Sequence, residues 1–378
     1  MRTSIPYHEV TWSGHEIEYL QQCLTSMHVH GDGPFTHRCE EILAQKLGSH
    51  RALLTTSGTD AIELASLLLD IQPGDEVIMP SFTFVSTANP FVLRGATPVF
   101  VDIRPDTLNL DETLLEAAIT SKTKAIVPVH YAGISCEMDT ILAIARRHNI
   151  AVIEDAAHGY LCEYKGKMLG SIGDMGVLSF HQTKTIAAGE GGVLLLNDQK
   201  FATRAEILRE KGTNRRQFFR GEVDKYTWCD VGSSFLPSDL IAAVLQAQLE
   251  AADGLLAKRR AIFSRYMELL KPLQEAGYVQ LPTVPSGTLG SGHIFYLILS
   301  DATHTAGLKK HLSEKSIASV SHYVPLHSSP AGERWGRAVG TLPVTDRVAS
   351  SILRIPIYPN LQAEDVEHIS QTISTFFS

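Results

Sequence analysis

One lysine in the middle of the chain lies in a setting suited to chemistry. Lys184 follows the segment SFHQT at 179–183 and stands between two apolar runs, 175–178 and 193–196, that predict buried strands. A lysine between buried strands must lose its hydration unless its amine is uncharged or bonded to another group. Glycines in the segment 189–192 allow backbone to approach a ligand closely. A lysine that simply reaches solvent from a loop is the plainer alternative.

A carboxylate precedes this lysine by about thirty residues. The run AVIED at 151–155 predicts a strand that ends in Asp155, and two alanines and His158 follow it. In open α/β sheets the reacting groups gather at the carboxyl ends of strands. Asp155 could cap the next helix or pair with a buried cation. Together with Lys184 it suggests pyridoxal phosphate, because a lysine binds the cofactor aldehyde and an aspartate keeps the pyridine nitrogen protonated.

A third candidate site is the predicted strand-to-helix turn TSGTD at 56–60. Backbone amides at a helix N-terminus form an anion site, and serine and threonine hydroxyls add donors. Ordinary N-capping by Ser57 or Thr59 explains the same residues equally well. The residues alone leave both interpretations open.

These motifs resemble those of the sugar-nucleotide aminotransferases of pyridoxal-phosphate fold type I. The resemblance covers nearly the whole chain, and several motifs in the family's order are far more specific than any single one. Within the family the chain most resembles the transaminases that convert TDP-4-oxo-6-deoxyglucose into TDP-4-amino-4,6-dideoxygalactose. The matching segments are 56–59, 80–87, 154–158, 179–184 and 189–192 for the family, and 211–215, 224–228, 231–236 and 322–327 for the closer group.

The resemblance implies roles for the main cofactor-binding residues. Gly58, Thr59 and Ser179 match positions that hold the cofactor phosphate. Asp155 matches the partner of the pyridine nitrogen. Lys184 matches the lysine that holds the cofactor and carries the proton, so it is the expected catalytic residue.

Two further side chains match positions around the cofactor ring. Phe84 matches the aromatic residue that stacks on the ring, and His158 matches a position that contacts the ring hydroxyl. From residue type alone, Phe84 would be a core residue and His158 would cap a turn.

The chain departs from the family in the segment GSSFL at 232–236. Many relatives have Gly-x-Asn-x-Arg here, and the asparagine reaches the cofactor phosphate of the neighbouring subunit. Ser234 replaces that asparagine, and Leu236 replaces the arginine. Because serine also donates to phosphate, the resemblance still implies a homodimer with shared active sites.

A basic and aromatic stretch is the candidate for binding a sugar nucleotide. A solvated surface loop is the alternative for such a charge cluster. Interleaved aromatic residues and the close resemblance favour binding of the diphosphate. The candidate residues are Asn214, Arg215, Arg220, Lys225, Tyr226 and His327.

Apolar strand patterns alternate with helical patterns from residue 52 onward, which implies a mainly parallel sheet wrapped by helices. The resemblance implies the α/β fold of fold type I aminotransferases: a mostly parallel seven-stranded sheet with flanking helices and a smaller C-terminal α/β domain. We expect the N-terminal arm and the large domain at 1–250, and a linking helix and the small domain at 251–378. The segment 214–220 is expected to be a loop, and 318–322 a strand.

Composition narrows the possible classes of protein. The 378 residues are 44% hydrophobic and 20% charged, as in ordinary globular proteins. The net charge of −8 disfavours a nucleic-acid partner. The five cysteines are scattered without a C-x-x-C pair, which fits a reducing cytoplasm better than disulfides or a metal site. No leader sequence and no membrane-spanning apolar run is evident, so we expect a soluble cytoplasmic protein.

The sequence therefore predicts a pyridoxal-phosphate enzyme of deoxyamino sugar biosynthesis. By resemblance, L-glutamate donates nitrogen to C4 of a TDP-linked 4-oxo-6-deoxy sugar destined for cell-surface polysaccharide. Alternatives are C3 amination of a 3-oxo-6-deoxy sugar and a non-catalytic regulator that binds the cofactor. Dehydratases of this group carry histidine in place of Lys184, which argues against them. No G-x-G-x-x-G follows the early strands, which disfavours a dinucleotide-binding dehydrogenase.

Overall fold

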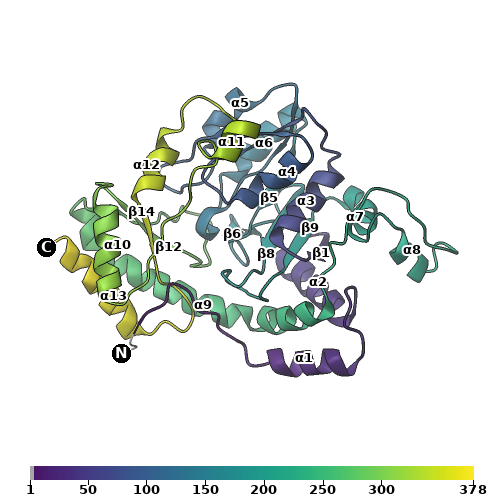
Figure 1. Cartoon of the computed structure of the whole chain (residues 1–378), viewed down its shortest axis with the longest axis horizontal. Coiled ribbons are helices and arrows are strands. Elements are labelled where there is room, and N and C mark those ends of the chain that lie inside the picture. Colours follow the sequence, from purple (N-terminus) through teal and green to yellow (C-terminus); the bar gives the residue numbers. More distant parts are fainter. Residues whose placement is uncertain (1–3) are drawn as a thin grey trace.

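The computed structural model describes residues 4–378, and its centre is an eight-stranded sheet (Figure 1). Neighbouring strands are parallel except at β9, which runs antiparallel to both β1 and β8. In sheet order the strands are β1 (Arg51–Thr55), β9 (Gly192–Leu196), β8 (Met175–Ser179), β5 (Ala151–Asp155), β4 (Thr123–Ile126), β2 (Glu76–Pro80), β3 (Thr97–Val101) and β13 (Arg337–Ala338).

This architecture confirms the predicted mostly parallel α/β fold, with one correction to the number of strands. Seven strands were expected, and the short strand β13, from the C-terminal part of the chain, pairs with β3 as an eighth. Without β13 the edge of β3 would present unpaired backbone groups. A two-residue strand has too little pattern to be recognised in the sequence.

Helices cover both faces of the sheet, because alternate residues of each strand point to opposite sides. Leu195 of β9 belongs to one apolar cluster and Leu194 to the other. Burial on both faces explains why 193–196 is continuously apolar. The first cluster includes α2 (Pro34–Leu47), α6 (Met138–His148) and α9 (Asp239–Glu275), and the second α3 (Gly58–Leu68), α4 (Asn89–Leu93) and α7 (Ala202–Arg209).

The 37-residue helix α9 runs from the large sheet to the C-terminal part of the chain (Figure 1). At its start, Asp239 accepts hydrogen bonds from the backbone N–H and the hydroxyl of Thr36, at 2.8 and 2.6 Å. By length and composition α9 could cross a membrane, but 50% of its apolar window is buried inside the protein, as in the core helix of a soluble protein. The domain boundary expected at 250/251 falls within this helix and stays a prediction.

A second apolar core lies in the C-terminal part, between the end of α9 and a small antiparallel sheet. The expected strand at 318–322 is wrong: its backbone forms only a single bridge, between Val320 and Arg354. The chain then turns toward the cavity described below, which interrupts the pairing. The elements of this part are β10 (Val279–Gln280), β12 (Phe295–Leu299), β14 (Ile352–Ile355), α10 (His304–Glu314), α12 (Pro343–Ser351) and α13 (Ala363–Phe376).

The segment expected to be a loop at 214–220 contains a short helix, α8 (Arg215–Phe219), which projects from the body of the molecule (Figure 1). The Phe218 N–H donates to the Asn214 carbonyl at 3.2 Å, and the Arg220 N–H donates to the Arg216 carbonyl at 3.1 Å. These helical hydrogen bonds correct the expectation. The remaining elements are α1 (Glu16–Thr25), α5 (Leu115–Ala118), α11 (Pro330–Trp335), β6 (Glu163–Tyr164), β7 (Lys167–Met168), β11 (Thr288–Leu289) and the 3₁₀ turns η1 (Val85–Thr87), η2 (Glu112–Leu114), η3 (Tyr131–Gly133) and η4 (Gln199–Phe201).

Candidate active site

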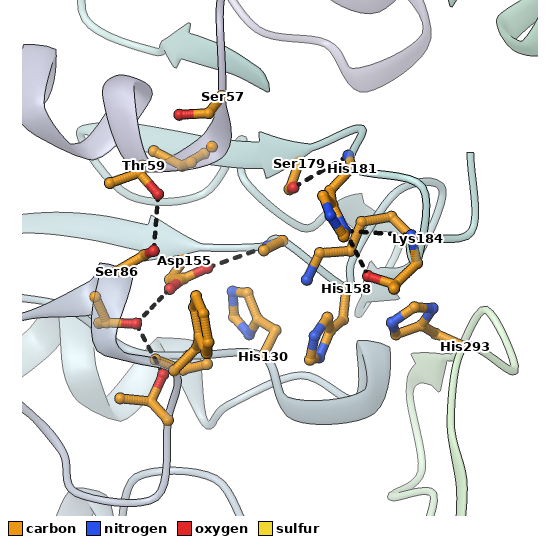
Figure 2. A pocket seen from close by; sticks show the side chains of 18 of the residues that line it. Ser57, Thr59, Ser86, His130, Asp155, His158, Ser179, His181, Lys184 and His293 are labelled. Atoms are coloured by element: carbon orange, nitrogen blue, oxygen red, sulfur yellow. Dashed lines mark hydrogen bonds between the residues drawn. The ribbon is translucent and has the colours of Figure 1, made fainter. Parts of the chain in front are cut away.

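A cavity of about 470 Å³ lies where the carboxyl ends of β5 and β8 meet the N-terminus of α3. Residues from the C-terminal part, including His293, His322 and Arg354, complete its wall. Figure 2 shows Lys184, Asp155 and His158 pointing toward one shared space. The topology thus brings together groups that are more than a hundred residues apart in the chain, such as Asp155 and His293.

Lys184 lies in the loop that joins the antiparallel strands β8 and β9. Backbone hydrogen bonds from Phe180 to Gly191 and from Gln182 to Gly189, at 2.8 and 2.9 Å, hold the two sides of this loop together. The pKa of Lys184 is lowered to about 8: burial lowers it most, the Asp155 carboxylate opposes that effect, and the Arg354 guanidinium adds to it. About a tenth of this amine is therefore neutral at pH 7, and about half at pH 8.

Asp155 ends β5 and is buried against the turn η1. Its Oδ2 accepts a hydrogen bond from the Thr87 hydroxyl at 2.7 Å, and its Oδ1 accepts one from the Ala157 N–H at 3.2 Å. Residues 156–162 form turns, so Asp155 does not cap a helix. No lysine, arginine or histidine among residues 4–378 forms an ion pair with it, so this buried carboxylate still lacks a cation.

The N-terminus of α3 supplies an anion site at one end of the cavity. The Ser57 side chain caps the helix by accepting from the Asp60 N–H at 3.0 Å, and the first amides of a helix have no intrahelical partner. The Thr59 and Ser86 hydroxyls are hydrogen-bonded to each other at 2.7 Å (Figure 2). Ser57, Thr59, Ser86 and Ser179 all line the cavity, as does Gly58.

Strand β9 passes so close to this turn that only glycine fits at its first position. A Cβ atom on Gly192 would lie 2.3 Å from the carbonyl carbon of Ser57. On the other side, a Cβ atom on Gly58 would lie 3.0 Å from the Ser179 Cβ. The close approach brings Ser179, at the end of β8, beside the helix N-terminus.

His158 and His293, which line the cavity, are held as neutral donors or acceptors. His158 Nδ1 accepts from the Ala132 N–H at 3.3 Å, so Nε2 carries the proton. Burial, together with the charge of Lys184, lowers the pKa of His158 well below its usual value, and the same causes act on His293, whose ring centroid lies 4.5 Å away. His158 can therefore donate a hydrogen bond without carrying charge.

The buried side chains of His130 and Glu154 form a pair that supports the end of β5. His130 Nδ1 accepts from the Cys136 N–H at 3.1 Å, and its Nε2–H donates to Glu154 at 2.9 Å. Glu154 also accepts from the backbone N–H groups of Gly170, Ile172 and Gly173, at 2.9, 2.6 and 2.7 Å. These bonds anchor the residue next to Asp155 in the strand.

Comparison with known proteins identifies the family to which the chain belongs. A family model described as the DegT/DnrJ/EryC1/StrS aminotransferase family matches residues 11–374. The chain belongs to this family. It is 34% identical to the spore coat polysaccharide biosynthesis protein SpsC of Bacillus subtilis, over 98% of this chain and 96% of that protein. It is 35% identical to the GDP-perosamine synthase of Caulobacter vibrioides, over 94% of each.

Solved structures agree with the family assignment. Spr1654 from Streptococcus pneumoniae, solved in its PLP form, superimposes with a TM-score of 0.90 at 27% identity, covering 98% of each chain. The fold is therefore confirmed as that of the aminotransferases. The protein is a pyridoxal-phosphate-dependent sugar aminotransferase that acts on a sugar-nucleotide ketone and an amino donor.

The residues present fit this cofactor. The helix N-terminus and four hydroxyls suit a phosphate, and the buried Asp155 carboxylate suits a protonated ring nitrogen. Phe84 is 57% exposed and lines the cavity, so it is not a core residue and its ring is free to cover a ligand. Gly58, Thr59, His158, Ser179 and Lys184 line the same cavity.

The other predicted site residues lie outside the cavity of the single chain. Ser234 is exposed, next to Phe235, whose carbonyl accepts from the Thr56 N–H at 2.9 Å. His327 does not line the cavity and is hydrogen-bonded to the Ser81 hydroxyl at 2.7 Å. Lys225 and Tyr226 are exposed beyond α8.

The other residues predicted to bind the sugar nucleotide form hydrogen bonds or ion pairs with neighbouring residues of the same chain. The Asn214 side chain accepts from the Thr227 N–H at 2.7 Å. Arg215 donates to Glu210 at 3.1 Å. Arg220 forms ion pairs with Glu206 and Glu222, at 3.0 and 2.6 Å. The basic stretch therefore carries its own counterions, unlike a bare phosphate-binding loop.

Sequence reasoning missed several residues that the fold brings to the cavity. Ser86 lay inside a motif that had been recognised, and so did His322, but neither had been assigned a role. Tyr7, His293 and Arg354 come from segments without any motif. Only the three-dimensional contact reveals them, because nothing in their local sequence distinguishes them from ordinary polar residues.

Proposed function

We propose that this sugar aminotransferase moves an amino group from L-glutamate to C4 of a TDP-linked 4-oxo-6-deoxy sugar. The products are TDP-4-amino-4,6-dideoxygalactose and 2-oxoglutarate, so a ketone and an amine exchange places and no external oxidant is needed. One observation carries the transamination chemistry: Asp155, a buried carboxylate without an ion-pair partner among residues 4–378, and Lys184, whose pKa is about 8, face the same cavity.

The choice of C4 and of TDP is supported by resemblance in the segments 224–228 and 322–327. Of these, His322 and Tyr323 line the cavity and can contact the sugar. A GDP-linked 4-oxo sugar is a second candidate, because a relative of 35% identity is a GDP-perosamine synthase. Amination at C3 is the third candidate.

Bound pyridoxal phosphate supplies a carbonyl group that condenses with amines and a ring that accepts an electron pair. Lys184 would hold the cofactor at rest; once the donor amine has displaced it, the freed and neutral Lys184 amine would remove and return the proton at the reacting carbon. Asp155 would keep the ring nitrogen protonated, and His158 would donate its Nε2–H to the ring oxygen. In this proposal Gly58, Thr59 and Ser179 hold the phosphate, and Phe84 covers the ring.

We further propose that two subunits share each active site. Ser234 is exposed beside the turn that opens α3, where it can reach a neighbouring subunit's phosphate. The segment before Ser234 exposes aromatic side chains: Trp228 is 77% exposed and Phe219 67%. In such a homodimer the α8 segment, with Arg215, Arg220 and Lys225, would approach the sugar nucleotide of the neighbouring subunit.

Product analysis tests the substrate. The purified enzyme is incubated with L-glutamate and, separately, TDP-4-oxo-6-deoxyglucose, its GDP-linked 4-oxo counterpart and a TDP-linked 3-oxo isomer. We expect mass spectrometry to show amination of the first compound, and NMR to show an axial C4 amine. Lys184→Ala is the inactive control. An equatorial amine contradicts the galacto configuration, and exclusive use of the GDP or 3-oxo compound contradicts the assigned substrate.

A further inference from the structure

Strand β14 brings an arginine into the active-site cavity, and its backbone is fixed on both sides. Arg354 pairs with Tyr296 of β12 on one side. On the other, its N–H donates to the Val320 carbonyl at 2.8 Å, and its carbonyl accepts from the Val320 N–H at 3.1 Å. The side chain therefore starts from a rigid position and lines the cavity.

The guanidinium of Arg354 lacks a counterion. No carboxylate among residues 4–378 forms an ion pair with it, and its Nε–H is buried without a hydrogen-bond partner in that part of the chain. The Tyr7 ring lies against it, 4.9 Å from the guanidinium carbon to the ring centroid. The Tyr7 ring covers one face and its hydroxyl hydrogen-bonds to the guanidinium, which leaves the unpartnered Nε–H and the remaining N–H groups available to an anion. An unpaired cation in a partly desolvated site is stabilised when an anion binds it.

The position of Arg354 indicates which of the anionic groups that enter this cavity it can bind. The cofactor phosphate has its own site at the N-terminus of α3. The charge of Arg354 lowers the pKa of Lys184, His158 and His293, so the guanidinium lies close to the reacting centre. In a nucleotide sugar the hexose ring separates the diphosphate from the ketone carbon. In an amino acid the α-carboxylate is bonded directly to the carbon that carries the amine.

We propose that Arg354 binds the α-carboxylate of the amino donor. This inference rests on the proposed function in that it assumes an amino-acid donor, and it assigns the residue that selects such a donor. A planar guanidinium matches the two oxygens of a carboxylate, and the contact orients the bond from the donor's reacting carbon toward Lys184. The same contact holds the α-carboxylate of the 2-oxoacid product.

The two halves of the reaction test this assignment separately. The first half is followed by absorbance when the holoenzyme is mixed with L-glutamate, and the second when the pyridoxamine-phosphate form is mixed with the nucleotide ketosugar. For Arg354→Gln we expect the L-glutamate concentration at half-maximal rate to rise about 10- to 100-fold. The ketosugar concentration at half-maximal rate should stay within about twofold of the wild type, even though the maximal rates of both halves change with the pKa of Lys184.

Calorimetric titration of the pyridoxal-phosphate form with 2-oxoglutarate, the product of the first half, gives a readout that does not depend on turnover. Arg354→Gln should weaken its binding by a similar factor, and Arg354→Lys, which keeps the charge but not the fork, should weaken it less. Arg265→Gln is the matched control, since Arg265 pairs with Glu268 and Glu367 on the exterior. Cofactor content and melting temperature establish that each variant is folded.

The outcomes separate this inference from the proposed substrate. If L-glutamate reacts normally with Arg354→Gln while the ketosugar half fails, Arg354 binds the diphosphate and the inference is overturned. Unchanged 2-oxoglutarate binding in Arg354→Gln, or no such binding by the wild type, also overturns it. If the wild type reacts with L-glutamate but with no TDP-linked ketosugar, the substrate assignment fails, and the donor half still decides the role of Arg354.

Discussion

The amine of Lys184 faces two opposing charges, the Asp155 carboxylate and the Arg354 guanidinium. Burial has the largest effect on its pKa, the guanidinium lowers that pKa further, and the carboxylate raises it. With a pKa of about 8, roughly half of the amine is neutral at pH 8, whereas only about 0.3% of an ordinary lysine is neutral there. The surroundings therefore make Lys184 a usable base.

Competitive labelling of the cofactor-free protein measures this pKa. Because only the neutral amine reacts with acetic anhydride, labelling of Lys184 should rise with pH and level off above a midpoint near 8. Arg354→Gln should raise the midpoint, since it removes a cation, and Asp155→Asn should lower it, since it removes an anion. Peptide mass spectrometry quantifies the label. A midpoint near the usual value for a lysine side chain would contradict the argument.

Asp155 should affect cofactor binding and turnover together. Removing one partner of a buried ion pair typically costs about 3–5 kcal/mol, so Asp155→Ala should bind pyridoxal phosphate far more weakly and turn over slowly even when saturated. Thr87→Val removes the 2.7 Å hydrogen bond to Asp155 together with the 2.8 Å hydrogen bond to Thr83, and should have a smaller effect of about 1–2 kcal/mol. Equilibrium titration and steady-state kinetics measure both. Near-normal turnover by Asp155→Ala would leave Asp155 with a structural role only.

At the scale of elements, the sequence allowed prediction of what depends on local pattern. Strands buried on both faces, such as β9, appear in the sequence as continuous apolar runs. The turn before α3 is recognisable from its hydroxyl residues and its glycine. Helix α8 was missed because five polar and aromatic residues show no helical periodicity. The segment 318–322 has a strand-like composition, but only one of its residues pairs with β14.

The closeness of β9 to the turn before α3 gives a prediction about an element rather than a reacting group. Gly192→Ala places a Cβ atom 2.3 Å from the Ser57 carbonyl carbon, so the backbone that forms the anion site must move. We expect a loss of stability of about 1–3 kcal/mol and weaker binding of pyridoxal phosphate.

Gly254→Ala is the matched control, because a Cβ atom there, on the exposed face of α9, meets no atom within 4 Å. That change should stabilise the protein by about 0.5–1 kcal/mol without affecting the cofactor. Urea unfolding and cofactor titration measure both variants. Equal behaviour of the two alanines would show that the close approach has no functional weight.

For the whole molecule, the chain's own fold accounts for only part of the predicted site. Lys184, Asp155 and the turn before α3 could be predicted because each lies at or after the end of a strand, and strand ends meet at one edge of the sheet. Ser234 and the α8 segment had been assigned by resemblance, and the single chain leaves both outside the cavity. The roles proposed for them would therefore require a second subunit, which a residue pattern cannot place.

A charge introduced at Ser234 tests the shared site. If Ser234 faces a neighbouring subunit's phosphate, Ser234→Asp should weaken pyridoxal-phosphate binding by like-charge repulsion, whereas Ser233→Asp, at the adjacent exposed residue, should be nearly neutral. Light scattering establishes whether the protein is a dimer. Equal cofactor affinity in both variants would contradict a phosphate contact for Ser234.

Mixing two chains with different defects then identifies which subunit supplies Lys184 and which supplies Ser234 to a given site. In a dimer of a Lys184→Ala chain with a Ser234→Asp chain, shared sites would combine into one site with both defects and one with neither. With equal amounts and random pairing, about a quarter of all sites should regain wild-type activity, because half of the dimers are mixed and each has one intact site. Differently tagged chains allow the mixed dimers to be isolated and assayed. Mixed dimers whose activity is no higher than that of the Ser234→Asp protein would show that each subunit builds its site alone.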